Sequence, residues 1–457
     1  MRHLTPARFI RSSALACSGF IYLAALSACG GGDSAAPVAP VTPPPPAPVV
    51  QVAPSVTAQP QAQSVADGQP ATFTVNAGGS APLSYQWSRN GVAIAGATAA
   101  SYTTPVAGLG DSADVLRVSV RNEAGTVNSD AAALLVSGIG VRTLAGGAAD
   151  STLARLDGVG KEARFLTAGA MTQDSAGNLF IADTLHKAVR KVTPGGVVTT
   201  LAGSVNASVT LRYPRAIAAG AGGALYVSDA ATADDAATAL RKIGSDGTVS
   251  TVVLPANAGD PRANDGAELA PRYTAVAADA AGNVYIATEV SRDGPDTCSS
   301  CVSRAIVRKV APDGKITLLL SIDGPSDLRN SVTALAVDKS GNVFALDRGN
   351  IVKIDSAGTV TTVLRNELGF ITALTVDAAG NLYFATEPFS GRASTWPIGA
   401  IGKVTPQGAV AVAADPNGTD ARFKTPGAQI ANPRGIAVDA GAVYVSGSGR
   451  VLKLVLP

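Results

Sequence analysis

Apolar and polar residues alternate over short stretches along most of the chain, and residues typical of tight turns separate these stretches. The segment PATFTVNA (70–77) alternates with a period of two, as a strand with one buried face does. Asn90-Gly91 divides the next apolar stretch in the manner of a two-residue hairpin turn. The pattern therefore predicts short antiparallel strands joined by hairpins.

One four-part unit recurs from residue 138 onward: an apolar strand ending in Asp, a turn ending in Gly-Asn, a second strand ending in Asp or Glu, and two further strands. The first half of the unit is clearest in four segments: QDSAGNLFIAD (173–183), ADAAGNVYIATE (278–289), VDKSGNVFALD (337–347) and VDAAGNLYFATE (376–387). Asp and Asn bond to nearby backbone in tight turns, and Gly adopts a positive φ. We interpret Asp174, Gly177 and Asn178 as turn residues and assign them no catalytic role.

The second half of the unit also repeats. Third strands are predicted at AVRKV (188–192), ALRKI (239–243), AIVRKV (305–310), NIVKI (350–354), AIGKV (400–404) and RVLKL (450–454). Fourth strands are predicted at VVTTLAG (197–203), TVSTVVL (248–254), KITLLLS (315–321), TVTTVLR (359–365) and AVAVAAD (409–415). The sixth fourth strand is predicted at GVRTLAG (140–146), which matches VVTTLAG, so an N-terminal strand is expected to close the ring and remove its edges.

These units resemble the NHL-repeat family of six-bladed β-propellers over about residues 138–457. Residues 53–137 resemble bacterial immunoglobulin-like domains, and Trp87 falls where that family buries a tryptophan in the sandwich core. The resemblance implies an all-β chain with an immunoglobulin-like β-sandwich, followed by a six-bladed NHL-type propeller closed by an N-terminal strand.

The N-terminus carries the pattern of a targeting segment. Three arginines among the first eleven residues precede an apolar run at 14–28, which ends in Leu-Ser-Ala-Cys. This ending resembles the lipobox of bacterial lipoproteins, which implies a signal peptide at 1–28 and a lipid on Cys29. By the same analogy, Gly30 after the cysteine favours the outer membrane of a Gram-negative bacterium. Residues 29–52 are rich in Pro and Ala and predict an extended tether.

The charge of the chain favours no nucleic-acid partner. Its 36 basic and 34 acidic residues give a net charge of +2, and the basic residues form no stripe. Charged residues make up 15% of the chain and Gly occurs 49 times, which argues against a helix-rich architecture.

Candidate ligand-binding residues follow from the propeller resemblance, which places the ends of second strands and the starts of first strands on one face. The acidic candidates are Asp183, Asp229, Glu289, Asp347 and Glu387. The basic candidates are Arg215, Arg272, Arg329 and Arg434, and the aromatic candidates in a long insertion are Phe389 and Trp396. Each has a structural alternative: the acids can cap turns or pair with arginines, and the aromatic loop can simply cover blade ends.

Cys298 and Cys301 form a C-x-x-C in another long insertion. A structural zinc site needs four ligands, and no second Cys pair is present. A thioredoxin-like redox site needs a βαβ context, which this segment lacks. In an oxidising envelope compartment we expect a local disulfide between them, and we assign no metal site.

Three functions remain open from the sequence. We favour a lipid-anchored envelope protein that binds a protein or glycan, contacts the membrane through Cys29 and carries no cofactor. The second is a Ca²⁺-dependent hydrolase, since gluconolactonase-like propeller enzymes bind Ca²⁺ in the channel through Glu, Asp and Asn. The third is a passive spacer. No nucleophile or phosphate-binding motif occurs in a supporting context, so no catalytic residue is assigned.

Overall fold

The computed structural model describes residues 50–138, 140–147, 155–203, 211–231, 237–252, 272–291, 302–325, 332–365, 370–387, 399–414 and 432–456. The chain divides into two compact units, residues 1–50 and 51–457, and every described residue except Val50 lies in the second. Three 3₁₀ turns are the only helical elements in these ranges: η1 (Leu109–Asp111), η2 (Gly160–Glu162) and η3 (Ala221–Gly223). None of the described helices is long and apolar enough to cross a membrane. The fold is therefore all-β, as predicted.

Residues 51–137, here called the N-terminal module, form three antiparallel or mixed sheets. Their strands are β1 (Ser55–Ala58), β2 (Gln63–Ala66), β3 (Thr72–Thr74), β4 (Asn76–Gly78), β5 (Ser84–Arg89), β6 (Val92–Ala93), β7 (Ser101–Thr103), β8 (Asp114–Asn122), β9 (Gly125–Asn128) and β10 (Ala132–Ser137). The main sheet has the order β2-β10-β8-β5-β6, with β9 on β8, and the pairs β1-β4 and β3-β7 form the smaller sheets.

Trp87 anchors the core of the N-terminal module. It is fully buried, its ring lies 6.4 Å from that of Phe73 and 6.3 Å from that of Tyr102, and its Nε1 donates to the carbonyl of Ala99 at 2.9 Å. Burial of this large ring, with its one polar atom satisfied, accounts for the tryptophan by packing alone. The predicted Asn90 turn is confirmed, with φ of +51° at Asn90. The immunoglobulin-like assignment stays a prediction.

The rest of the described chain forms six four-stranded antiparallel repeats, numbered 1 to 6 in chain order. Repeat 1 contains β13 (Ala168–Gln173), β14 (Leu179–Asp183), β15 (Ala188–Val192) and β16 (Val197–Ala202); repeat 2 contains β17 (Tyr213–Ala219), β18 (Leu225–Ala230), β19 (Ala237–Ile243) and β20 (Val249–Val252). Repeat 3 contains β21 (Arg272–Ala278), β22 (Val284–Ser291), β23 (Val302–Val310) and β24 (Ile316–Pro325); repeat 4 contains β25 (Val332–Val337), β26 (Val343–Asp347), β27 (Asn350–Ile354) and β28 (Val360–Leu364). Repeat 5 contains β29 (Phe370–Val376), β30 (Leu382–Glu387), β31 (Ile401–Val404) and β32 (Val410–Ala414); repeat 6 contains β33 (Pro433–Val438), β34 (Ala442–Gly447), β35 (Arg450–Val455) and β11 (Gly140–Ala145).

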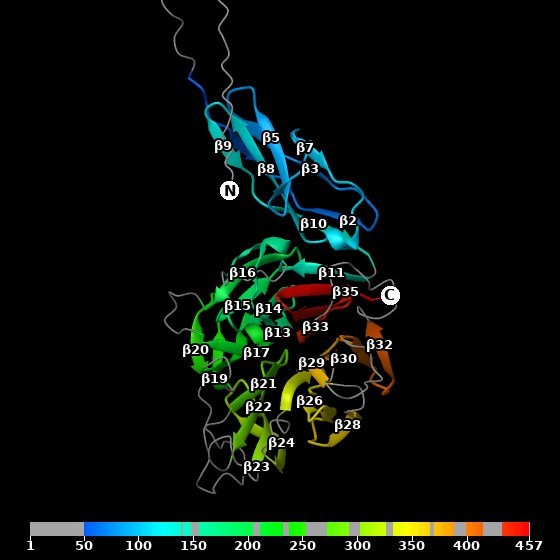
Figure 1. Cartoon of the computed structure of the whole chain (residues 1–457). Helices are drawn as coiled ribbons and strands as arrows, with labels where there is room; N and C mark the ends of the chain where they lie inside the picture. Colours follow the sequence, from blue (N-terminus) through cyan, green and yellow to red (C-terminus); the bar gives the residue numbers. More distant parts are fainter. Residues whose placement is uncertain are drawn as a thin grey trace, which may run out of the picture. The chain divides into compact units, whose positions relative to one another are not determined.

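The first strands of these repeats contact one another in a closed circuit. The contacts run from β13 to β17, β21, β25, β29 and β33, and from β33 back to β13. In Figure 1 the colours pass from green through yellow to red around this circuit. A single four-stranded sheet cannot bury both of its faces, so each repeat packs on its two neighbours. The arrangement is propeller-like.

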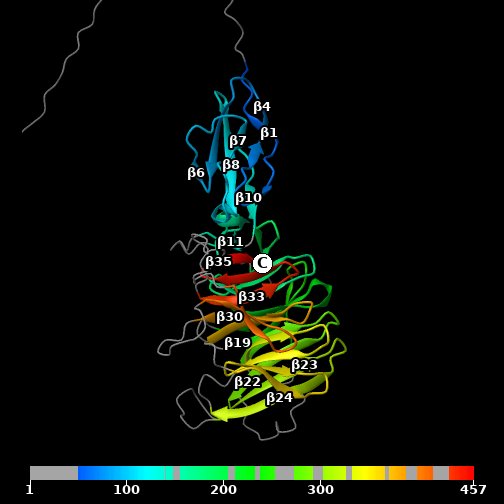
Figure 2. The ribbon, with the colours of Figure 1, turned by 90° about the vertical axis from the view of Figure 1, so that its right-hand side faces the viewer.

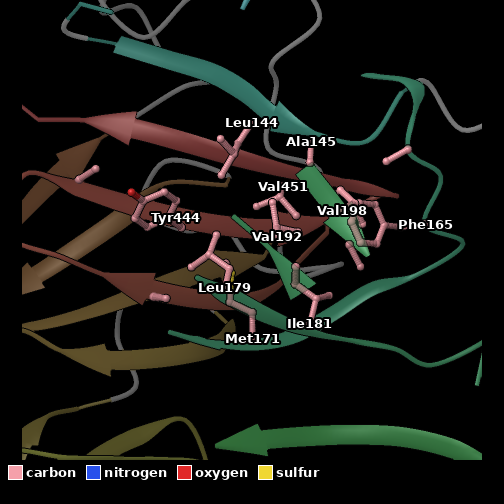
Figure 3. Packing of buried hydrophobic residues seen from close by; sticks show 14 residues of the cluster. Leu144, Ala145, Phe165, Met171, Leu179, Ile181, Val192, Val198, Tyr444 and Val451 are labelled. Atoms are coloured by element: carbon pink, nitrogen blue, oxygen red, sulfur yellow. The ribbon is translucent and has the colours of Figure 1, made fainter. Parts of the chain in front are cut away.

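The predicted N-terminal closing strand is confirmed. Strand β11 pairs antiparallel with β35, from Gly140 opposite Val455 to Ala145 opposite Val451. Figures 1 and 2 show β11 beside the red β35. Figure 3 shows Leu144 and Ala145 of β11 packing with Val451 of β35 and with side chains of repeat 1. One hydrophobic cluster therefore joins the first and last repeats, and β11 supplies the fourth and outermost strand of repeat 6.

The Asp-x-x-Gly-Asn motif forms a hairpin turn, as interpreted from the sequence. Asp174 Oδ1 accepts the backbone N–H of Asn178 at 2.8 Å, and Asp174 Oδ2 accepts the Asn178 side-chain amide at 2.8 Å. Gly177 has φ of +81°, which disfavours any side chain. The same bonds recur in repeats 3, 4 and 5. These residues are therefore structural.

The N-terminal module contacts repeat 1 through the segment that precedes β13. Arg117 donates from Nε and Nη2 to the carboxylate of Glu162 at 3.1 and 2.8 Å. Lys161 Nζ donates to Asp114 Oδ1 and to the carbonyl of Gly110, both at 2.7 Å. The short strand β12 (Gly158–Val159) in the same segment pairs with β16 and covers the outer edge of repeat 1.

Candidate functional site

The two ends of the ring differ in the lengths of their connections. At one end, first strands turn into second strands and third into fourth through short segments such as 174–178, 338–342, 355–359 and 439–441. At the other end, here called the loop face, the chain links repeats and joins second to third strands. Its connections include 253–271, 292–301, 388–400 and 415–432. Long connections on a rigid scaffold commonly carry binding residues.

The five acidic candidates all lie on the loop-face side, but they occupy two registers. Asp183, Asp229 and Asp347 lie opposite Ala168, Pro214 and Val332, which are equivalent positions of the first strands. Glu289 and Glu387 lie one residue further along, opposite Arg272 and Phe370. A shift of one residue in a strand moves a side chain to the other face of the sheet. The expected single ring of carboxylates is therefore two sets facing different sides.

The position equivalent to the three aspartates is Thr288 in repeat 3 and Thr386 in repeat 5. Thr288 Oγ1 accepts from Arg308 Nη1 at 3.2 Å, and Thr386 Oγ1 donates to the carbonyl of Ala400 at 3.3 Å. Both threonines can be located in the sequence by counting residues from the turn asparagine. The aspartate or threonine is the fifth residue after Asn178, Asn283, Asn342 or Asn381, and each glutamate is the sixth.

Asp183 is fully buried and satisfied within the protein. Its Oδ1 accepts the backbone N–H groups of Leu166 and Thr167 at 3.2 and 3.1 Å. Its Oδ2 lies 2.7 Å from His186 Nδ1 and accepts from Arg190 Nη1 at 3.1 Å. Asp183 thus caps the segment entering β13 and neutralises Arg190, which supports the structural alternative for this residue.

Arg190 is fully buried beneath the loop face. Its second amino group, Nη2, donates to the carbonyl of Leu156 at 2.9 Å and to Asp157 Oδ1 at 2.7 Å. Burial raises the pKa of Asp157, but hydrogen bonds from Thr200 and the charge of Arg190 outweigh it, and the net pKa lies below the ordinary value. Arg190 therefore links two carboxylates from different segments of repeat 1.

Asp229 repeats the capping role in repeat 2. Its Oδ1 accepts the N–H groups of Arg212 and Tyr213 at 2.9 and 2.8 Å, and its Oδ2 accepts from Arg241 Nε at 3.4 Å. Asp347 in repeat 4 accepts from Arg348 Nε at 3.3 Å. The three aspartates are therefore each held by an arginine near the loop face.

The glutamates differ from the aspartates in their surroundings. Both are half-buried, and Glu289 lies directly across the strand pair from Arg272. Glu387 lies across from Phe370, whose side chain is 52% exposed. Among the described residues, Glu387 Oε1 is a buried oxygen with no hydrogen-bond partner. Phe370 was not a candidate from the sequence; an aromatic residue at the outer end of a first strand was the available signal.

The arginine candidates also separate by register. Arg215 and Arg434 lie at the bulge of their first strands, where pairing shifts between Pro214 and Ile217 and between Pro433 and Gly435. Bulges re-aim side chains near functional sites. Arg215 is half-buried, whereas Arg434 is exposed and has no hydrogen-bond or ion-pair partner among the described residues.

Several candidates lie outside the described residues. These are Arg329, Phe389, Trp396, Cys298, Cys301 and Cys29. Their assignments stay predictions.

The six first strands enclose a cavity of about 370 Å³. It is lined by three consecutive residues from five of these strands, such as Ile217–Ala219 and Val276–Ala278, and by residues 171–175 of repeat 1. The one acidic residue in this lining is Asp174, whose oxygens are bonded to its own turn. In the part of the chain that the structure describes, no three residues among His, Cys, Asp and Glu gather as a metal site.

Comparison with known proteins assigns no family. No family model and no curated protein matches the chain. A solved gluconolactonase from Xanthomonas campestris is 14% identical, with 69% of this chain and 89% of that chain covered and a TM-score of 0.44. An auxiliary nutrient binding protein from Bacteroides thetaiotaomicron is 13% identical, with coverage of 88% and 97% and a TM-score of 0.46. A virginiamycin B lyase from Staphylococcus aureus is 14% identical, with coverage of 75% and 91% and a TM-score of 0.38. Similarity at this level transfers no activity or ligand.

Proposed function

We propose that this chain is a lipid-anchored cell-envelope protein whose propeller-like ring binds a protein or glycan at its loop face. The observation that supports this proposal most directly is the unequal distribution of chain between the two ends of the ring. Tight turns occupy one end, while the long connections of several repeats gather at the other. A closed ring fixes the positions of the strand ends that these connections join, and a rigid scaffold of this kind suits binding loops.

The charges at the loop face fit binding better than acid–base chemistry. Asp183 and Asp229 are held by arginines and backbone N–H groups, and Asp347 is held by Arg348, so all three have structural partners. Arg434 is exposed at a bulge, and Phe370 exposes half of its surface. Arginine is among the residue types that most often dominate binding energy, and phenylalanine is enriched in protein interfaces.

Partner capture from envelope extract tests the proposal. The intact lipoprotein in mild detergent is expected to retain a specific partner, and Trp396→Ala with Arg434→Ala is expected to weaken retention by about tenfold or more. The matched control is Lys339→Ala, which also removes a positive charge but lies in the 338–342 turn at the opposite end of the ring. Quantitative mass spectrometry of the retained proteins and glycans gives the readout.

Loss of the partner from the Lys339→Ala control as well would contradict a site on the loop face. If neither the parent nor the control retains a specific partner, the binding proposal loses its support. Ca²⁺ content and lactone hydrolysis of the purified protein would then be measured, because a Ca²⁺-dependent hydrolase is the second function that the sequence leaves open.

The lipid anchor has a separate test. Replacing Cys29 with serine is expected to block lipid attachment, so that the protein no longer incorporates radiolabelled palmitate. Cys17→Ser serves as the control, because Cys17 lies inside the apolar run at 14–28 and is expected to leave labelling unchanged. Labelling of the Cys29→Ser variant at the parent level would show that the anchor lies elsewhere.

A further inference from the structure

The strongest unexplained feature of the loop face is the pair formed by Glu387 and Phe370 in repeat 5. The two residues lie directly opposite each other on β30 and β29. Side chains in this relation are about 4.5–5.5 Å apart at Cβ and contact one another. One carboxylate oxygen of Glu387 is buried without a hydrogen-bond partner among the described residues, while the ring of Phe370 is half exposed beside it.

Repeat 3 shows what the same position accommodates elsewhere in this chain. There the equivalent glutamate, Glu289, lies opposite Arg272 rather than opposite an aromatic residue. The strand pair thus places an arginine directly across from the glutamate. In repeat 5 the sequence keeps the carboxylate and replaces the cation with Phe370, so no basic residue lies opposite Glu387.

The third strand of repeat 5 places an apolar residue nearest to Glu387 on the same face. Ile401 lies opposite Ala385, two residues before Glu387. The next residue of β31 on that face, Lys403, lies opposite Tyr383, and its Nζ is 5.5 Å from the centroid of that ring. A half-buried carboxylate without a cation is costly unless a partner supplies one.

We infer that Glu387 and Phe370 form a subsite for an organic cation, namely the ammonium or guanidinium group of a lysine or arginine side chain on a protein partner. The carboxylate would accept charge-assisted hydrogen bonds, and the exposed ring face would attract the same cation. This inference rests on the proposed binding function and narrows it, because it specifies the chemistry of the group that the partner presents.

Weak-affinity chromatography of the intact lipoprotein tests the subsite. The matrices carry aminobutyl, guanidinobutyl or neutral hydroxybutyl groups, and n-butylammonium chloride or an equal concentration of sodium chloride is the competitor. We expect retention on one or both cationic matrices, little retention on the neutral matrix, and stronger displacement by n-butylammonium than by sodium. The cationic matrix that retains more protein distinguishes a lysine-like from an arginine-like group.

Glu387→Gln is expected to reduce the retention factor by about tenfold, and Phe370→Leu by about threefold. The matched control is Glu123→Gln, which makes the same charge change at an exposed position of the N-terminal module and should retain the parent behaviour. Phe370 is half exposed, so its variant tests the site even where Glu387→Gln alters folding.

Equal retention of Glu387→Gln and Glu123→Gln would overturn the inference, as would full retention of Phe370→Leu or equal retention on the neutral matrix. These results separate the subsite from the wider function. Partner capture that depends on Arg434, combined with no cation retention, would leave the binding function standing and remove only the subsite.

Discussion

Replacing Arg190 with leucine is expected to lower the free energy of unfolding by about 3–5 kcal/mol, the cost of breaking a buried ion pair by removing one partner. Arg190 and Asp183 are both fully buried, and the Arg190 guanidinium also bonds Asp157 and the carbonyls of Leu156 and Arg164. Without the guanidinium, the carboxylate of Asp183 stays inside the protein with less compensation, and the segment before β13 loses the group that ties it to repeat 1.

Chemical denaturation followed by tryptophan fluorescence and circular dichroism gives this free energy. The matched control is Arg241→Leu at the equivalent position of repeat 2. The Arg241 side chain is 18% exposed, and its Nε lies 3.4 Å from Asp229, so its replacement is expected to cost clearly less. Equal losses from the two variants would show that burial of Arg190 does not set its contribution.

Replacing Gly402 with valine is the second change with a large expected effect, a loss of about 3 kcal/mol, at the upper end of the range for overpacking a core. A Cβ atom at Gly402 would lie 2.0 Å from Cζ of Phe384, a ring that is itself fully buried. The ring cannot move outward, because repeats 4 and 5 pack around it. Strand β31 would have to shift away from β30.

A second substitution should rescue part of this loss. At the positions equivalent to Phe384 and Gly402, repeat 4 has Ala345 opposite Val352. Repeat 4 therefore already contains the reverse arrangement, with the small residue on the second strand and the larger residue on the third. Phe384→Ala alone is expected to cost about 3–5 kcal/mol through the cavity that it leaves. We expect the Phe384→Ala, Gly402→Val double variant to lose about 2 kcal/mol less free energy of unfolding than the two single variants lose in total. Additive losses in this double-mutant cycle would contradict direct packing of the two positions.

The strands of the ring could be predicted because their turns carry a strong local signal. The Asp-x-x-Gly-Asn motif fixes a hairpin through hydrogen bonds among a few neighbouring residues. The repeated third-strand motifs AVRKV (188–192) and NIVKI (350–354) likewise coincide with β15 and β27. The closing strand at 140–145 could be predicted for a related reason, since its sequence repeats that of a fourth strand.

The candidate site could be predicted only in part. The sequence places the acids near one end of the ring. Each acid is treated as the last residue of its strand, so the one-residue offset between Asp183 and Glu387 cannot be seen. That offset decides which face of the sheet the side chain occupies. The partner of each acid depends on contacts between distant segments, such as Arg190 with Asp157, which no local pattern reports.

The pairing of β11 with β35 gives the ring a fixed order of completion. The first strand of this pair lies at 140–145 and its partner at 450–455, so the ring stays open until nearly all of the chain is available. Contacts between residues so far apart form late and slow the folding of β proteins. A chain that still lacks β35 therefore has an unpaired β11 and an open ring.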